Sequence, residues 1–302
     1  MIGIFYKSTP LFRGTLLIMC SAILYGFMGY FGMGAVREHL SVSAMLFWRF
    51  FLAGTFISFL LLKQGSFSSS QPYLEKKILF FTFFLGAVGY AGASGFYFLS
   101  ARYTGTGIAM VIFFSYPMVI AFFSWIIYQQ RFTLFTLISF IAMLVGLFLL
   151  NQDNTIAHFN TWGILFGVLA AFSYTLYVMG SKRHAHLSLD PNLMTLLVCF
   201  GSAFIFFLIA LFTHQFSAPT SFRGWEYLLA LSFLSTALPI QLMLKGLKHV
   251  SSLRASLISG FEPLITLWIG IIILDEPISQ IQLLGIVLLL TSTLFIQVQK
   301  EI

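Results

Sequence analysis

Long apolar stretches alternate with short polar segments along the whole chain. Charged residues, prolines and glycines mark the boundaries, and most stretches approach the roughly 20 residues that a helix needs to cross a bilayer. The pattern predicts ten transmembrane helices, at residues 11–35, 42–62, 78–100, 105–127, 133–150, 162–180, 192–212, 226–246, 252–274 and 280–298. The connections are too short for a soluble domain, so functional residues are expected in the helices or at their ends.

The composition is that of a protein whose solvent is mostly lipid. Of the 302 residues, 59% are hydrophobic and 8% are charged, whereas a soluble domain carries about 25% charged residues. Cys20 and Cys199 both lie inside apolar stretches, which argues against a disulfide framework or a zinc site and predicts two buried thiols. The first stretch begins near Leu11 without an Ala-x-Ala cleavage pattern, so we expect a retained helix and not a signal peptide.

The basic residues are distributed unequally between the two sets of loops. Twelve Lys and Arg fall on one side of the predicted membrane, whereas Arg37, Arg102 and Arg223 fall on the other. Because cytoplasmic loops are enriched in Lys and Arg, we expect a multi-pass protein of the cell inner membrane with both termini in the cytoplasm. The net charge of +7 is scattered over these loops and forms no basic patch for nucleic acid.

The second half of the chain repeats the pattern of the first. Tyr116-Pro117 aligns with Glu262-Pro263 at an offset of 146 residues, which also lays the fifth predicted helix on the tenth. Because each half has five helices, the second half enters the membrane from the opposite side. The predicted fold is an all-α membrane protein of ten transmembrane helices in two inverted five-helix repeats, residues 1–150 and 151–302.

Four segments have a recognisable pattern. Residues 252–282 contain Glu-Pro inside a helix and Leu-x-Glu before the last helix; the others are WRFFLAG at 48–54, SYPMV at 115–119 and AAFSYTLYVMGSKR at 170–183. These segments resemble the EamA-type members of the drug/metabolite transporter superfamily. The chain departs from that pattern at Phe27-Met28 and at Gln130. The resemblance implies secondary transport of amino acids, nucleoside-like metabolites or drugs, with a cavity between the two repeats.

Glu262 is the leading functional candidate because it is the one carboxylate well inside a predicted helix. An acid at membrane depth costs about 2.5–3.5 kcal/mol on insertion scales, so a partner or a function must compensate. As a proton carrier, Glu262 would bind a proton from one side of the membrane and release it to the other. The alternative is a carboxylate that caps a broken helix or hydrogen-bonds across the repeat interface without titrating.

Three prolines are expected to interrupt helices at membrane depth. Pro117, Pro239 and Pro263 each lack the N–H that would bond the carbonyl four residues earlier. Paired interruptions in corresponding segments of the two halves mark the binding site in inverted-repeat transporters. The third predicted helix instead contains glycines at residues 86, 89, 92 and 95, for which close helix packing is an equally good interpretation.

Polar side chains at helical spacing predict faces that look into a cavity. Ser252, Ser256, Ser259, Glu262 and Thr266 share one face of the ninth helix, and tyrosines with serines share faces of the third and sixth. The candidate substrate-binding residues are Tyr25, Arg49, Tyr90, Ser94, Tyr97, Tyr116, Tyr174, Tyr177, Gln241, Ser259, Glu262 and Trp268. The alternative for the tyrosines is bundle packing with satisfied hydroxyls.

Arg49 lies about 10 Å inside the second predicted helix, at about 1.5 Å per residue. Two interpretations are open: it binds a substrate carboxylate, or it snorkels or hydrogen-bonds between helices and fixes the helix in place. No sequence argument places it against Glu262.

The sequence lacks the motifs that an enzyme or a primary pump would need. The chain has no intramembrane Ser–His pair, no H-E-x-x-H or C-x-x-C, and no G-x-x-x-x-G-K-[ST], so neither an enzyme nor a primary pump is predicted, and no cofactor or metal is expected. A channel and a scaffold without transport stay as alternatives. The predicted function is alternating-access transport of a small organic metabolite, with protons or a counter-substrate as coupling partner. The preferred substrate class is amino acids or related compounds, and the alternatives are nucleoside-like or S-adenosylmethionine-type metabolites and drugs.

Overall fold

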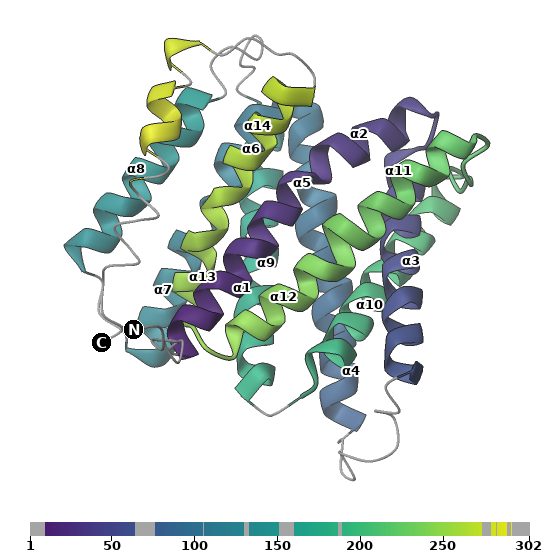
Figure 1. Ribbon diagram of the computed structural model, residues 1–302, viewed down its shortest axis with the longest axis horizontal. Helices are drawn as coiled ribbons and strands as arrows, with labels where there is room; N and C mark the ends of the chain where they lie inside the picture. Colours follow the sequence, from purple (N-terminus) through teal and green to yellow (C-terminus); the bar gives the residue numbers. More distant parts are fainter. Residues whose placement is uncertain are drawn as a thin grey trace, which may run out of the picture.

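The protein is helical throughout the part of the chain that the structure describes (Figure 1). The structure is a computed structural model that describes residues 10–63, 76–104, 106–129, 133–150, 160–186, 189–273, 279–281, 283–288 and 291. Seven helical spans in these residues are long and apolar enough to cross a membrane, and a shorter apolar helix covers Leu134–Leu149. The all-helical prediction is therefore confirmed. Most of the tenth predicted helix, residues 280–298, lies outside the described residues.

The helices follow one another in the order that the hydropathy pattern predicts. The first half contains α1 (Pro10–Gly26), α2 (Met28–Arg37), α3 (Val42–Lys63), α4 (Lys76–Phe84), η1 (Leu85–Tyr90), α5 (Ala91–Thr104), α6 (Thr106–Phe113), α7 (Tyr116–Tyr128) and α8 (Leu134–Leu150). The second half contains α9 (Thr161–His186), α10 (Pro191–Phe212), α11 (Phe222–Ser232), η2 (Phe233–Ala237), α12 (Leu238–Leu247), α13 (Ser252–Ile258), η3 (Ser259–Phe261) and α14 (Glu262–Ile273).

Several spans are interrupted at the points where proline chemistry predicts it. The break between α6 and α7 immediately precedes Tyr116-Pro117, the π-helical segment η2 precedes Leu238-Pro239, and the 3₁₀ segment η3 precedes Glu262-Pro263. In each case the missing proline N–H leaves a carbonyl without its usual helical donor, so the chain changes its hydrogen-bond register locally. The interruptions predicted at these three prolines are thus present.

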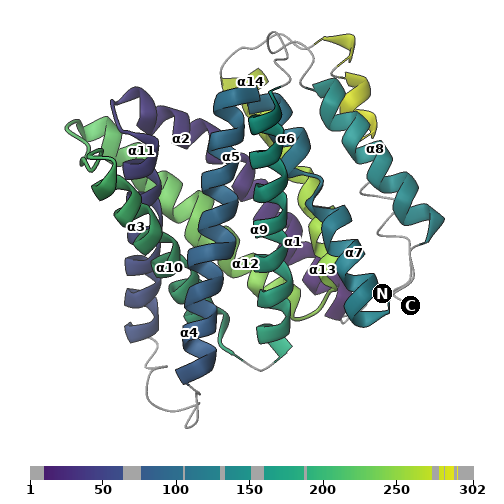
Figure 2. The same cartoon turned by 180° about the vertical axis from the view of Figure 1, so that it is seen from behind.

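Three helix pairs pack side by side in the bundle (Figures 1 and 2). Helix α3 packs along α10, α5 packs along α9, and α1 packs along α12. The segment η1 and α10 meet backbone to backbone, because a Cβ built on Gly86 would lie 2.3 Å from the Val198 carbonyl oxygen and one on Gly201 would lie 2.2 Å from that of Phe83. Close packing is therefore the role of Gly86, as one of the two sequence interpretations expects.

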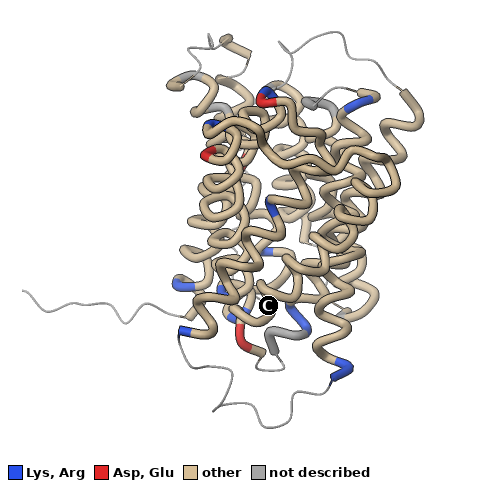
Figure 3. Tube along the Cα trace, turned by 90° about the vertical axis from the view of Figure 1, so that its right-hand side faces the viewer, with Lys and Arg blue, Asp and Glu red and all other residues tan. Residues whose placement is uncertain are grey.

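Charged side chains concentrate at the two ends of the bundle (Figure 3). The end that holds the α3–α4 connection and the C-terminal ends of α9 and α12 is rich in lysine, with Lys63, Lys76, Lys77, Lys182, Lys245 and Lys248. At the opposite end lie Arg37, Arg102 and Arg223. The interior therefore has few charges, and those that occur in it need a structural or functional explanation.

Lys182 connects the end of α9 to the junction between α12 and α13. Its Nζ donates hydrogen bonds to the carbonyl oxygens of Leu247 at 2.6 Å and Val250 at 2.7 Å. These carbonyls lie at the C-terminal end of α12, where helical donors are missing and a cation is electrostatically favourable. The lysine thus caps one helix from the side of another.

Replacing this lysine should lower stability measurably. We expect Lys182→Met to cost about 1–2 kcal/mol, since charge-assisted hydrogen bonds are strong but the side chain is partly exposed. The midpoint of thermal unfolding in detergent measures the loss. Lys248→Met is the matched control, because Lys248 is also partly exposed and its side chain makes no hydrogen bond within the described ranges. Equal midpoints for the two variants would contradict the capping role.

Candidate substrate-binding site

Five tyrosines from four different spans meet in the middle of the bundle. Tyr25 comes from α1, Tyr90 from η1, Tyr116 from α7, and Tyr174 and Tyr177 from α9, and all five side chains are buried. The hydroxyls of Tyr25 and Tyr90 are hydrogen-bonded at 2.9 Å. Ring centroids are 4.8 Å apart for Tyr90 and Tyr177 and 4.7 Å apart for Tyr116 and Tyr174, both in edge-to-face geometry. We call these five residues the tyrosine cluster.

Tyr97 extends the cluster along α5, and Ser94 lies three residues before it on the same helix. The Tyr97 ring lies 5.7 Å from the ring of Phe113, which in turn lies 5.4 Å from both Tyr116 and Tyr174. Both Tyr97 and Ser94 are partly exposed, unlike the tyrosines of the cluster. Phe113 was not among the sequence candidates, because a phenylalanine in an apolar helix gives no signal that separates it from the lipid-facing ones.

Glu262 begins α14 beside the tyrosine cluster. Its charge interacts electrostatically with Arg49 and with four tyrosines, at positions 90, 97, 116 and 174. The residue is half-buried, and no hydrogen bond to its carboxylate occurs among the residues that the structure describes. The carboxylate is therefore without a hydrogen-bond partner in the described part of the chain.

The backbone around Glu262 is tied closely to the first helix. The Thr266 hydroxyl donates to the Gly26 carbonyl at 3.0 Å, and a Cβ on Gly26 would lie 2.4 Å from the Ile265 Cβ. Gly26 immediately precedes the interruption between α1 and α2 at Phe27. Two interrupted helices therefore cross at the level of the carboxylate, the arrangement found where backbone lines a site at membrane depth.

The serines predicted to line the ninth helix bond within their own helix. The hydroxyl of Ser259 donates to the Ala255 carbonyl at 3.0 Å, and that of Ser256 to the Leu253 carbonyl at 2.7 Å. Tyr116 contributes from the opposite side, because its hydroxyl donates to the Ser256 carbonyl at 3.1 Å. The structure thus places Ser259 next to the cluster but gives its proton a partner inside the chain.

Arg49 is fixed in place by the second half of the chain. Its side chain is 2% exposed, and its Nε donates to the Thr236 hydroxyl of η2 at 2.7 Å. The guanidinium carbon lies 4.9 Å from the centroid of the Phe50 ring, within cation–π range. This geometry matches the second sequence interpretation, an arginine that hydrogen-bonds between helices. Thr236 was not a candidate, and its position three residues before Pro239 was the available sequence signal.

Two sequence candidates make no contact with the cluster. Gln241 donates from its Nε2 to the Asn192 Oδ1 at the start of α10, so its amide is satisfied elsewhere. Trp268 is 54% exposed, because six residues after Glu262 at about 100° per residue place it on a different face of α14. Within the described part of the chain, neither side chain has a ring contact or hydrogen bond with the tyrosine cluster.

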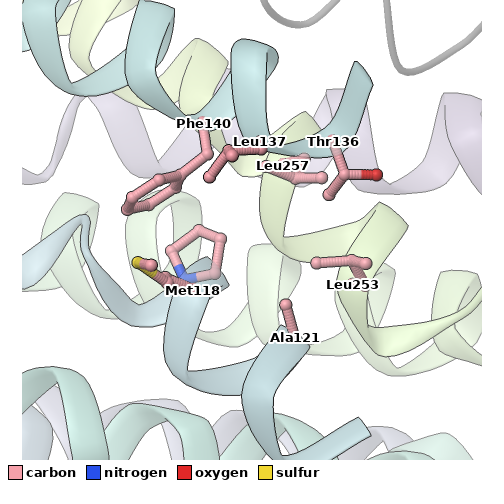
Figure 4. A pocket seen from close by; sticks show the side chains of 8 residues that line it. Met118, Ala121, Thr136, Leu137, Phe140, Leu253 and Leu257 are labelled. Atoms are coloured by element: carbon pink, nitrogen blue, oxygen red, sulfur yellow. The ribbon is translucent and has the colours of Figure 1, made fainter. Parts of the chain in front are cut away.

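A separate crevice lies between α7, α8 and α13 (Figure 4). Its lining is apolar except for one hydroxyl, and it consists of Pro117, Met118, Ala121, Thr136, Leu137, Phe140, Leu253 and Leu257. None of these residues is a sequence candidate, and none of the described residues that line the crevice is charged. It lacks the polar groups that orient a small polar ligand, so the tyrosine cluster with Glu262 is the better candidate site.

Comparisons with known proteins agree with this architecture. The profile of the EamA-like transporter family matches residues 12–152 and 161–298. The uncharacterized transporter YyaM of Bacillus subtilis (strain 168) is 23% identical over 85% of this chain and 84% of its own length. The threonine/homoserine exporter RhtA of Escherichia coli (strain K12) is 26% identical over 74% of this chain and 72% of its own length.

The fold itself also has a solved counterpart. A crystal structure superposes with a TM-score of 0.80 and 14% sequence identity, over 94% of this chain and 98% of the other. The resemblance seen in the sequence motifs is confirmed by the family match, which spans most of the chain. The protein is therefore an integral multi-pass membrane protein that belongs to the EamA-like transporter family of the drug/metabolite transporter superfamily.

Proposed function

We propose that this protein is a secondary transporter of small organic metabolites that works by alternating access, and that its substrates are amino acids or related compounds. The observation that supports it best is Glu262, a half-buried carboxylate at a helix interruption within electrostatic range of the tyrosine cluster. A central site of this kind, built at broken helices near the midplane, is the usual arrangement in secondary transporters. The amino-acid class is favoured by the named activity of the Escherichia coli relative.

The pairing of helices supports two inverted repeats of five helices, residues 1–150 and 151–302. Exchanging the halves turns the α1–α12 pair into the α9–α5 pair and returns the α3–α10 pair to itself. Single residues follow the same exchange: a Cβ on Gly14 would touch Val250, and a Cβ on Gly163 would touch Thr104. Offsets of 149 residues between the glycines and 146 between their partners are close to the sequence offset.

The repeats provide the two states that the mechanism needs. The π-helical segments η1 and η2 begin 148 residues apart, and the interruptions before Pro117 and Pro263 are 146 apart. Matching weak points in both halves allow the same local change to occur in either half, so the site opens to one side or the other. Protons or a counter-substrate would supply the energy, with Glu262 as the group that binds one of them.

The charge distribution supports an inner-membrane location with both termini in the cytoplasm. Lysines concentrate at the end of the bundle that holds the α3–α4 connection, and this end corresponds to the predicted cytoplasmic side (Figure 3).

The decisive experiment is transport by the purified protein in liposomes. Uptake and counterflow of labelled amino acids and nucleoside-like metabolites are measured with and without an imposed pH gradient. We expect saturable flux of at least one amino acid, and dependence on the gradient if a proton is the coupling partner. Absence of flux for the whole panel, in protein shown to be folded by its thermal transition, would overturn the proposed function.

A further inference from the structure

We infer that the site recognises the ammonium group of its substrate, through Glu262 and the tyrosine ring faces, and that Arg49 does not bind a substrate carboxylate. This inference rests on the proposed transport of amino acids and related compounds, and it specifies which end of such a molecule the protein reads. An amino acid carries an ammonium group and a carboxylate, which could bind Glu262 and Arg49 respectively. The structure distinguishes the two ends because Glu262 and Arg49 differ in their hydrogen bonds and in their exposure.

Glu262 is the available charge. It is half-buried, it lies within electrostatic range of Tyr97, Tyr116 and Tyr174, and its carboxylate accepts no hydrogen bond within the described ranges. A carboxylate with free lone pairs in a low-dielectric interior is best satisfied by a cationic donor, and an ammonium group offers three N–H donors. A ligand amine therefore completes a site that the protein leaves incomplete.

Arg49 is the committed charge. Its Nε bonds Thr236 at 2.7 Å, its guanidinium lies against Phe50, and its side chain is 2% exposed. The Thr236 hydroxyl in turn donates to the Leu231 carbonyl at 2.8 Å, which fixes the acceptor. The bond from Arg49 to Thr236 uses one of the five N–H donors of the guanidinium, and a substrate carboxylate would reach the others only at a side chain that is 2% exposed. An ammonium group at Glu262 would meet a half-buried carboxylate instead. The charge of Arg49 instead offsets that of Glu262 from a distance.

The tyrosine rings favour a cation at the same place. Tyr116 and Tyr174 pack edge-to-face with ring centroids 4.7 Å apart, and Tyr174 lies 5.7 Å from Tyr177. Tyr116 and Tyr174 both lie within electrostatic range of Glu262. Ring faces attract cations and repel carboxylates through the ring quadrupole. The predicted ligand class is thus primary amines and amino acids, in which the carboxylate is dispensable, and N-acylated or dicarboxylic compounds are excluded.

The test compares matched ligands on the unmodified protein. Thermal unfolding of the purified protein in detergent is titrated with L-threonine, L-threonine amide and N-acetyl-L-threonine, and with the corresponding leucine series. Ligands that bind the folded state raise the midpoint. We expect the amide to bind within about 3-fold of the amino acid and the N-acetyl compound to bind about 10-fold or more weakly, because only the latter lacks the cation.

Each outcome decides one question. If the N-acetyl compound binds as well as the amino acid and the amide does not shift the unfolding midpoint, ammonium recognition is overturned. The proposed transport of amino acids is unaffected by that result. Amides that bind while both amino acids are silent support ammonium recognition and overturn the amino-acid class. A response to no compound overturns the proposed amino-acid class and this inference with it.

A matched pair of variants tests the role of Glu262 directly. Glu262→Gln keeps the shape of the side chain, and we expect it to weaken amide binding about 10-fold or more. Glu226→Gln is the same change at an exposed position of α11 and should leave binding unaltered. Unchanged amide binding by a folded Glu262→Gln protein would overturn the inference.

Discussion

Transport by the Glu262→Gln protein should fall at least about 10-fold below that of the unmodified protein in the same liposome assay. The change removes one negative charge and keeps the size of the side chain, so the loss reports on charge and not on packing. The carboxylate lies within electrostatic range of four tyrosines and accepts no hydrogen bond from the described residues, so none of these residues takes the place of a ligand donor.

The folding of this variant should be unimpaired. A neutral amide is less costly than a carboxylate at membrane depth, where charged acids cost about 2.5–3.5 kcal/mol on insertion scales. The thermal midpoint of Glu262→Gln should therefore equal or exceed that of the unmodified protein. Glu226→Gln, at the exposed end of the bundle, is the control for both measurements. Normal flux with a normal midpoint would remove Glu262 from the mechanism and leave a structural role at the interruption before Pro263.

The comparison with an imposed pH gradient distinguishes two roles of the same carboxylate. If Glu262 exchanges a proton for substrate, the residual flux of Glu262→Gln should no longer respond to the gradient. If it only binds substrate, the residual flux should keep the response of the unmodified protein at a lower rate. The alternatives concern the coupling ion alone, because both predict the loss of overall rate.

Sequence periodicity was a good guide to the tyrosines. Tyr90 and Tyr97 were grouped by helical spacing on one span, and Tyr174 and Tyr177 on another, and the structure brings three of them into one aromatic cluster with Tyr25 and Tyr116. The spacing rule works because a helix fixes which residues share a face. It cannot say which faces of different helices meet. Trp268 is a candidate for another reason, that an amphipathic side chain inside a helix needs a partner, and its side chain is 54% exposed.

The partners of buried polar groups were harder to foresee. Arg49 and Thr236 are 187 residues apart in sequence, and Gln241 and Asn192 are 49 apart, on different helices in both cases. Local sequence shows only that a buried amide or guanidinium needs a partner. Selecting the partner requires the depth and rotation of two helices, and the η2 segment shifts that rotation by its π-helical register.

Some helix interruptions could be predicted from the local sequence, whereas another depends on a neighbouring helix. Those at Pro117, Pro239 and Pro263 follow from the missing proline N–H and were predictable. The π-helical segment η1 contains no proline, and its Gly86 carbonyl accepts a hydrogen bond from the Ser202 hydroxyl at 2.9 Å. A neighbouring helix thus takes part in the altered register, and no local rule would have predicted it.

Replacing Gly201 with alanine should destabilise the bundle by about 3 kcal/mol or more, the largest structural effect that we predict for a single methyl group. The new Cβ would lie 2.2 Å from the Phe83 carbonyl oxygen and 2.9 Å from the Ala87 nitrogen. Both atoms belong to the backbone, so no side chain can rotate to make room. Relief requires α10 to move away from α4 and η1, which would also separate Ser202 from the Gly86 carbonyl.

Gly95→Ala is the matched control, because it adds the same methyl group to a helix that also faces α10. Its Cβ would lie 3.7 Å from the Phe206 ring, which is an ordinary contact distance. Alanine is a better helix former than glycine by about 0.5–1 kcal/mol, so this variant should be neutral or slightly stabilised. The two glycine replacements therefore have opposite expected signs in thermal unfolding. A Gly201→Ala protein as stable as Gly95→Ala would mean that α10 and η1 do not cross backbone to backbone, and the central helix pairing, with the site it positions, would have to be revised.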